Sequence, residues 1–105
     1  MNSDIDTDLV PVLKALANPT RLCILDWLKE PARHFPPQDH PASEVGVCLK
    51  HIQAKAGVSQ STASQFMATL ERAGLVTSRR IGQWTHYKRD DDAITEFGRR
   101  LQSEL

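Results

Sequence analysis

Long hydrophobic runs are missing from this 105-residue chain, and so is any excess of one charge. No stretch approaches the roughly 20 apolar residues that a membrane-spanning helix needs, and the acidic beginning, MNSDIDTD, differs from a secretory signal. We therefore expect a cytoplasmic protein that does not enter a membrane. The length suits one compact domain, so residues 1–105 are interpreted as a single domain.

Cysteines and catalytic motifs are also scarce. Cys23 and Cys48 are too few for a disulfide framework, so both thiols are expected to be reduced, with Cys23 acting as a small packing residue. The sequence contains no glycine-rich phosphate loop, no nucleophile elbow and no coherent set of acid, base and nucleophile. These absences argue against an enzyme.

The zero net charge conceals an uneven distribution along the chain. Residues 1–49 hold four basic and seven acidic side chains, whereas residues 50–89 hold seven basic and one acidic. Residues 90–105 hold two basic and five acidic. A basic middle segment is expected when one face of a small domain meets phosphates, although a chance fluctuation of solvated charges is the alternative.

Apolar residues at helical spacing predict two helices at the start of the chain. The first covers residues 8–17, and the second begins with Asn18 as its cap and Pro19 at its first position. Pro31 is expected to stop the second helix. The following segment, PARHFPPQDHPASE (31–44), is rich in proline and has no periodicity, which predicts a long irregular loop.

A helix-turn-helix is predicted next. Val47 to Ala56 form a third helix that Gly57 closes in a left-handed conformation. Ser59 caps a fourth helix that runs from Gln60 to Ala73. Only a few residues join these two helices, and so short a connection makes them cross steeply.

The rest of the chain predicts a hairpin and a last helix. Residues 75–89 alternate around Gly82 and are rich in β-formers, which is typical of two antiparallel strands. Residues 90–105 begin with acids suited to a helix start and carry an apolar stripe that needs a cover. The fold class is therefore α+β and mostly α. The stripe consists of Ile94, Phe97, Leu101 and Leu105, which could alternatively pack within one subunit.

Short polar side chains crowd the first turns of the predicted fourth helix. A helix that enters the major groove of DNA needs short base-reading groups near its N-terminal end, because long ones would hold the backbone away. A polar cap with a solvated face is the competing interpretation. The candidate DNA-reading residues are Ser59, Gln60, Ser61, Thr62, Ser64 and Gln65.

The hairpin that follows this helix is basic and favours the DNA interpretation. A basic ribbon beside a reading helix can straddle the DNA backbone or reach a minor groove. Solubilising charges at an exposed sheet edge are the alternative. The candidate DNA-binding residues of the hairpin are Arg79, Arg80, Gln83 and His86, and Lys88 and Arg89 add to its charge.

Three motifs in this order, KALANPTRLCILDWL, GVSQSTASQFMATLERAGLV and SRRIGQWTHYK, resemble the ArsR group of winged helix-turn-helix repressors from Leu9 to the end. The resemblance implies four helices, a two-stranded wing and a C-terminal helix. It also implies a homodimer formed through the first and last helices, a double-stranded DNA operator, and repression relieved by an inducer. Gln65 and Phe66 depart from the basic pair of many members. A winged-helix module that binds proteins instead of DNA is the alternative function.

The resemblance also suggests where an inducer acts. Metal-sensing members carry three cysteines at the start of the third helix, and the matching GVCLKH has Gly46, Cys48 and His51. Cys48 and His51, three apart on a helix, could supply two ligands to a soft or borderline metal, and His34 and His40 could complete the set. A redox-active Cys48, an organic inducer, or no inducer at all are the alternatives.

Overall fold

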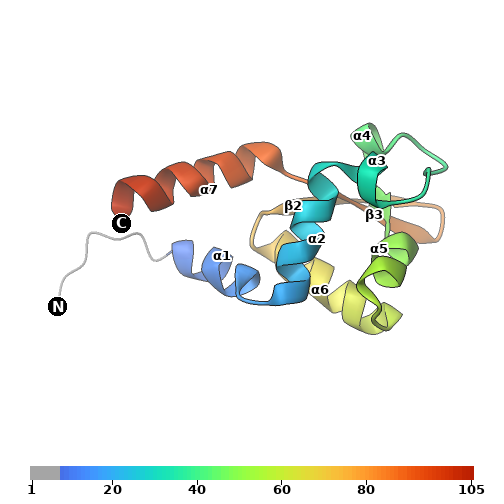
Figure 1. Ribbon diagram of the computed structural model, residues 1–105, viewed down its shortest axis with the longest axis horizontal. Helices are drawn as coiled ribbons and strands as arrows, with labels where there is room; N and C mark the ends of the chain where they lie inside the picture. Colours follow the sequence, from blue (N-terminus) through green and yellow to red (C-terminus); the bar gives the residue numbers. More distant parts are fainter. Residues whose placement is uncertain (1–7) are drawn as a thin grey trace.

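The computed structural model describes residues 8–105, and Figure 1 shows their arrangement along a 50 Å long axis. α1 and α7 lie at one end of this axis, whereas α5 and the tip of the β2–β3 hairpin lie at the other. None of the helices in this range is long and apolar enough to cross a bilayer. The elements are α1 (Leu9–Leu16), α2 (Pro19–Lys29), α3 (Pro31–His34), α4 (Ala42–Val45), β1 (Val47–Cys48), α5 (Leu49–Ala56), α6 (Gln60–Arg72), β2 (Val76–Ile81), β3 (Trp84–Arg89) and α7 (Asp91–Glu104).

The joint between α1 and α2 confirms the predicted helix start. Asn18 Oδ1 accepts a hydrogen bond of 2.9 Å from the backbone N–H of Arg21, and Pro19 occupies the first helical position. The Arg21 guanidinium then turns back and donates to the carbonyls of Ala15 at 2.6 Å and Lys14 at 3.1 Å. It thereby satisfies the Ala15 carbonyl at the end of α1 and adds to the bond that the Lys14 carbonyl accepts from the backbone N–H of Ala17.

The predicted third helix and proline-rich loop need correction. The segment 31–44 contains two one-turn helices, α3 and α4, instead of an irregular loop throughout. Val47 and Cys48 form the short strand β1, so the helix begins at Leu49. Gly46 causes the difference, because its φ of 87° and ψ of −164° turn the chain from α4 into an extended path.

The three strands form an antiparallel sheet in the order β1-β3-β2. The β2–β3 hairpin is the predicted one, and Gly82 in its turn has the positive φ that such turns favour. The additional strand β1 pairs Val47 with Tyr87 and Cys48 with His86. The sheet therefore links the start of the helix-turn-helix directly to the hairpin.

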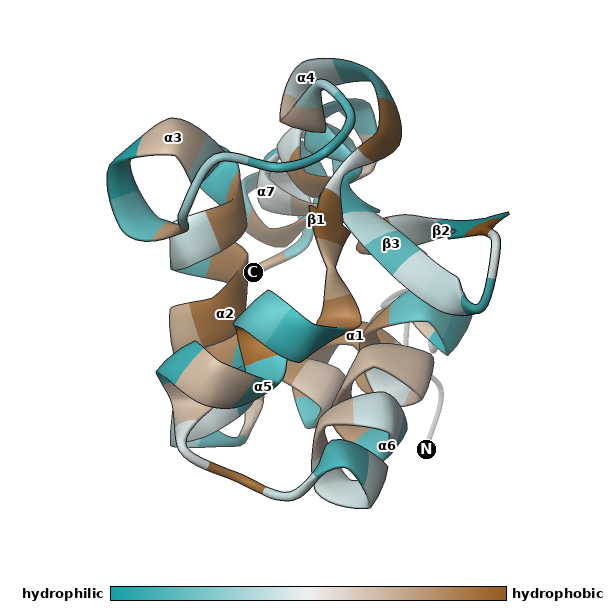
Figure 2. Ribbon diagram, turned by 90° about the vertical axis from the view of Figure 1, so that its right-hand side faces the viewer, coloured by the Kyte–Doolittle hydropathy of each residue, from teal (hydrophilic) through white to brown (hydrophobic). Residues whose placement is uncertain are grey.

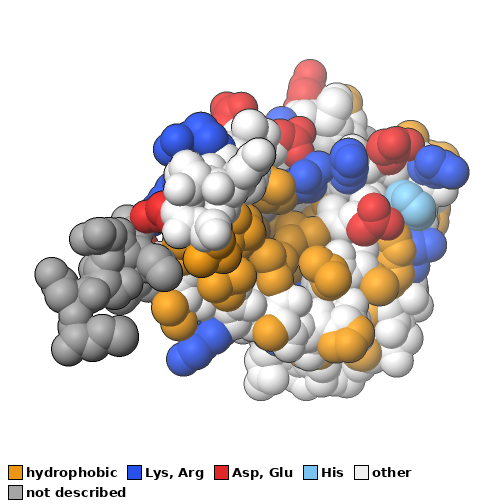
Figure 3. Space-filling view, turned by 60° about the vertical axis from the view of Figure 1, so that its left-hand side comes forward, with side chains coloured by type: hydrophobic (Ala, Val, Ile, Leu, Met, Phe, Trp, Pro, Cys, Tyr) orange, Lys and Arg blue, Asp and Glu red, His pale blue; other side chains and the backbone are white. Residues whose placement is uncertain are grey.

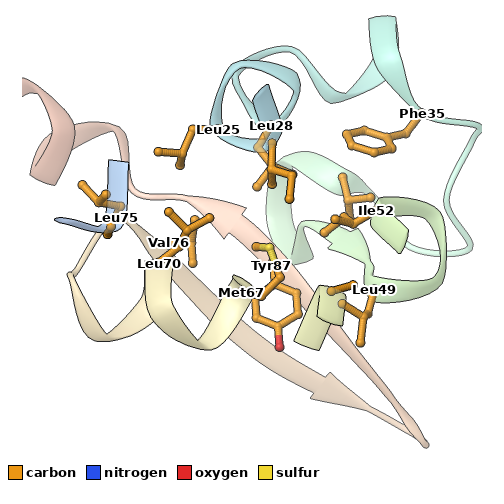
Figure 4. Packing of buried hydrophobic residues seen from close by; sticks show 14 residues of the cluster. Leu25, Leu28, Phe35, Leu49, Ile52, Met67, Leu70, Leu75, Val76 and Tyr87 are labelled. Atoms are coloured by element: carbon orange, nitrogen blue, oxygen red, sulfur yellow. The ribbon is translucent and has the colours of Figure 1, made fainter. Parts of the chain in front are cut away.

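The core lies between α2, α6 and the sheet (Figure 4). Leu25 and Leu28 point from α2 toward Met67 and Leu70 of α6, and Tyr87 of β3 closes the cluster. Met67 and Leu70 are fully buried. Burying a side chain of this size stabilises a fold by about 1.5–3 kcal/mol. The core thus fixes the rotation of α6 about its axis, and with it the direction of that helix's polar side.

Candidate nucleic-acid interface

The helix-turn-helix consists of α5, a short turn and α6. Gly57 ends α5 with φ 68° and ψ 34°, as predicted for a left-handed cap. Ala63, Met67 and Leu70 then hold α6 on the core at helical spacing. The side chains on the remaining surface of its first turns, those of Gln60, Ser61, Ser64 and Gln65, are all exposed. The structure therefore gathers the predicted reading residues on one free side of α6.

Two members of the predicted set cap the helix. Ser59 Oγ accepts a 3.1 Å bond from the N–H of Thr62 and donates to Thr62 Oγ1 at 2.9 Å. The cap interpretation therefore holds for this pair. In contrast, the side chains of Gln60, Ser64 and Gln65 form no hydrogen bond with any residue between 8 and 105, which leaves their donors and acceptors for a partner.

Replacing Ser59 with alanine is expected to lower the free energy of unfolding by about 1 kcal/mol, because the substitution removes the acceptor for the first turn of α6. Urea denaturation measures this loss. Ser64→Ala is the matched control, since Ser64 is exposed on the same helix and its side chain forms no hydrogen bond with the described residues. Equal unfolding energies for the two variants would contradict the capping role.

Phe66, which departs from the basic pair that the resemblance leads one to expect, packs against a neighbouring helix. Its ring is half-buried, and the guanidinium of Arg21 lies 5.6 Å from the ring centre. This cation–π contact joins the NPTR turn to α6. Phe66 is therefore a packing residue, and the neighbouring Gln65 carries the polar surface at this level of the helix.

The two arginines of the hairpin point to opposite faces. Arg79 lies opposite His86 in the register, whereas Arg80 lies opposite Thr85, and successive side chains of a strand alternate between faces. Ser78 shares the face of Arg80 and donates a 2.7 Å bond to Glu71 Oε2 of α6. Both arginines are exposed, but only Arg80 is on the face that meets α6.

His86 does not fit the predicted DNA contact. Its side chain is 6% exposed and points away from solvent beside Cys48 of β1. Arg89 is also occupied, because its guanidinium lies 3.2 Å from Asp91 Oδ1. The basic surface of the hairpin therefore consists of Arg79, Arg80 and Lys88, with Gln83 exposed in the turn.

The neighbouring Tyr87 points into the core. Burial raises the pKa of its phenol above the ordinary value of 10.0, and the nearby Glu71 carboxylate adds to the rise. Tyr87 is therefore neutral at physiological pH. Its role is to pack, and it adds no charge to the hairpin.

The predicted sensor residues lie near one another, but not on one helical face. Cys48 belongs to β1 and is buried, whereas His51 is half-buried on α5. Gln38 lies between them, since its Oε1 accepts from the Cys48 N–H at 3.1 Å and lies 3.1 Å from His51 Nδ1. Within residues 8–105 no three His, Cys, Asp or Glu side chains are placed to hold a metal ion. The shared helical face on which the metal prediction depended is absent.

Two further predictions about these residues are wrong. Cys23 is exposed on α2 instead of packed. His34 lies in a separate depression with residues of α2, among them Asp26 and Lys29, and does not approach Cys48. The proline-rich segment therefore brings only His40 toward the predicted sensor.

An apolar groove lies between α7 and the α1–α2 pair, as Figure 3 shows from the left-hand side of Figure 1. α7 has no buried residue, and Leu13 and Leu22 are 43% and 53% exposed. Exposed apolar surface of this extent marks an interaction site. The groove has a volume of about 460 Å³, and its apolar lining is Leu16, Leu22, Leu25, Leu75, Ile94, Phe97 and Leu101.

The sequence does not predict two contacts that hold the candidate DNA-binding surface together. The Arg21 bridge from α2 to α1 and the Glu71–Ser78 bond between α6 and β2 position the reading helix and the hairpin. Figure 2 shows the hairpin extending beside α6, with α5 at the same end of the molecule. A helix-turn-helix with an exposed polar reading helix and a basic β-hairpin beside it defines a winged helix-turn-helix DNA-binding domain.

Known proteins agree with this class. YbzH of Bacillus subtilis (strain 168), an HTH-type transcriptional regulator, is 47% identical over 97 residues, which cover 91% of this chain and 97% of the relative. ArsR2 of Halobacterium salinarum is 34% identical over 88 residues, covering 84% and 64% of the two chains. No protein-family model matches. The chain belongs to the ArsR family of HTH-type transcriptional regulators.

A solved structure extends the agreement to the whole fold. The homodimeric winged helix-turn-helix DNA-binding domain Mb0332 from Mycobacterium bovis is 29% identical and superposes with a TM-score of 0.64, over 91% of this chain and 76% of that one. The comparisons thus confirm the predicted fold and the DNA-binding regulator, and they give no support to a protein-binding module.

Proposed function

We propose that two copies of this chain form a repressor that binds a two-fold symmetric DNA operator in the cytoplasm. The proposal is supported by two separate interaction surfaces on one small domain. One is the polar side of α6 with the wing, and the other is the apolar groove beneath α7. The first suits DNA, and the second suits another copy of the same chain.

The position of the two surfaces fits a dimer on DNA. The groove involves the end of the molecule with α1 and α7, whereas α5 and the wing tip lie at the opposite end (Figure 1). Two domains joined at their α7 ends would present two α6 helices outward. Dimers of this class bind half-sites about 34 Å apart, one turn of the duplex.

Gel-shift titration with the DNA upstream of the chain's own gene tests the proposal. We expect binding at low salt, with an affinity that falls steeply as salt increases because counterions are released from the contacted phosphates. Repressors often regulate the genes beside them, which makes this DNA the natural first probe. The absence of any protein-dependent band at low salt would contradict the proposal.

Arg80→Ala is expected to weaken binding to all DNA sequences alike and to reduce the salt slope by about 2, since a dimer loses two phosphate contacts. Gln60→Ala and Ser64→Ala are expected instead to change which DNA sequence the protein prefers, because the side chains of Gln60 and Ser64 face the bases in the proposed complex. Anisotropy titrations on several duplexes at several salt concentrations measure both effects.

Arg33→Ala is the matched control for charge, since Arg33 is exposed on α3 and pairs with Glu30 away from α6. A salt slope for Arg80→Ala that equals the slope of this control would exclude a phosphate contact of the wing.

A further inference from the structure

A second groove lies between α1 and the C-terminal end of α6, and its charge is positive. Its volume is about 360 Å³, and Lys14, Arg21 and Arg72 line it. Among residues 8–105, no Asp or Glu side chain lines this α1–α6 groove. Glu71, next to Arg72 in the sequence, accepts a 2.7 Å bond from Ser78 of β2 instead. The groove therefore suits a negatively charged partner.

Arg72 is the basic residue of segment 50–89 that the hairpin does not contain and that no aromatic ring holds. The hairpin contains four of the seven basic residues of this segment. Lys50 and Lys55 lie over tryptophan rings, at 5.7 Å and 5.0 Å from the ring centres. Arg72 is exposed, and its Nη2 reaches the hydroxyl of Thr69 at 3.4 Å without an ion pair to any described residue. Its charge is therefore available to a partner.

Arg72 also lies on the same side of α6 as the reading residue Gln65. Seven residues, about two helical turns, separate the two, so their side chains point in nearly the same direction. Thr69 lies between them and donates a 3.0 Å bond to the Gln65 carbonyl. At 1.5 Å per residue, Arg72 lies roughly 10 Å beyond Gln65 along the helix axis. The exposed reading side of α6 therefore continues into the α1–α6 groove.

α1 forms the other wall of the groove. Pro11, Lys14 and Ala15 are three and four residues apart, which places them on one face of α1. Lys14 is exposed and forms no ion pair among residues 8–105. Arg21 is fixed between the walls, because its guanidinium donates to two carbonyls of α1 and lies over the Phe66 ring of α6. The positive charges of Lys14 and Arg72 thus face a partner from two helices.

The groove lies closer to the end of the molecule that joins two subunits than the reading residues do. α6 runs from its start beside α5 toward α1, and α1 and α7 occupy the end that bears the apolar groove (Figure 1). The wing tip lies at the opposite end. In the dimer, the α1–α6 groove is therefore nearer to the two-fold axis than the reading turns of α6, and the wing tip is farther from it.

We propose that the α1–α6 groove binds the DNA backbone between the two half-sites, with Lys14 and Arg72 of each subunit contacting phosphates. Lysine and arginine are common partners of DNA phosphates, and such contacts fix the register of a protein on the duplex. The wing then holds each half-site from the outside and this groove holds it from the inside. The inference rests on the proposed operator binding.

The test measures how salt weakens binding to the DNA upstream of the chain's own gene. A dimer of the double variant Lys14→Gln, Arg72→Gln loses four phosphate contacts, so we expect the slope of log affinity against log salt to decrease by about 3.5. The double variant Lys14→Arg, Arg72→Lys keeps both charges and should keep the wild-type slope. Arg33→Gln, exposed on α3 and paired with Glu30, should keep it as well. Circular dichroism checks that each variant is folded.

Ethylation of single phosphates locates the contacts on the same DNA. For the wild type, ethylation between the half-sites should interfere with binding. For Lys14→Gln, Arg72→Gln this central interference should disappear, while interference at the outer phosphates near the wing should remain.

Two results would overturn the groove contact while leaving the operator proposal intact. One is a salt slope that Lys14→Gln, Arg72→Gln leaves unchanged. The other is a reduced slope with the central interference still present, because the two charges would then act only at long range. Absence of wild-type binding at low salt would overturn the operator proposal and this inference with it.

Discussion

Replacing Gly46 with alanine is expected to destabilise the protein by at least about 3 kcal/mol, because backbone strain and a steric clash act together. Gly46 has φ 87° and ψ −164°, a conformation that only glycine adopts readily. A Cβ at this position would overlap the carbonyl of Tyr87 and lie 2.8 Å from the backbone nitrogen of Lys88. To relieve this clash, β1 must separate from β3 or α4 must shift. Either movement disturbs the connection between the helix-turn-helix and the wing.

Gly57→Ala is the matched control for this substitution. Gly57 also has a positive φ, 68°, but a Cβ there would meet nothing within 4 Å. Strain alone should cost about 1 kcal/mol. Thermal and urea unfolding measure both variants. Because small domains are stable by only about 5–15 kcal/mol, the Gly46 variant should melt far earlier, and equal losses for the two variants would exclude the clash.

Replacing Phe97 with aspartate is expected to produce a monomer and to reduce operator affinity by about 10²- to 10⁴-fold. Phe97 lines the groove between α7 and α2, and no residue of α7 is buried within one subunit. A carboxylate in the dimer interface would be desolvated without a partner. Each domain would then bind its half-site alone and lose the gain that comes from linking two binding events.

Thr95→Asp is the control, because Thr95 is exposed on the same helix and does not line the groove. Sedimentation measures the oligomeric state, and circular dichroism shows whether the fold survives. We expect the Thr95 variant to remain a dimer. If the Phe97 variant stays dimeric and binds with wild-type affinity, the groove is not part of the dimer interface.

Much of the fold could be predicted because local signals and tertiary packing agree. Asn18 and Pro19 start α2, and Ser59 starts α6, through hydrogen bonds that depend on neighbours in the sequence. The spacing of Ala63, Met67 and Leu70 predicts which side of α6 is buried. The exposed polar side follows from the same spacing, so the sequence alone predicts the reading helix and its free surface.

The errors fall where distant segments decide the outcome. Helical spacing placed Val47 and Cys48 in a helix, but pairing with Tyr87 and His86 draws them into a strand. The sequence predicts His86 as a DNA-binding residue of the hairpin, but pairing with β1 places it away from solvent. No local pattern in the sequence indicates a third strand of only two residues. Gly46 similarly looked like a lost metal ligand, although the close approach of the Tyr87 carbonyl explains the glycine.

Selection of bound sequences from a pool of random DNA identifies an operator without assuming its sequence, and it shows directly whether a dimer reads that operator. We expect enrichment of a two-fold symmetric site whose half-sites lie one helical turn, about 34 Å, apart and are occupied by two subunits. Enrichment of a single asymmetric site by one subunit, or of no sequence at all, would contradict a dimer that reads DNA through its paired α6 helices.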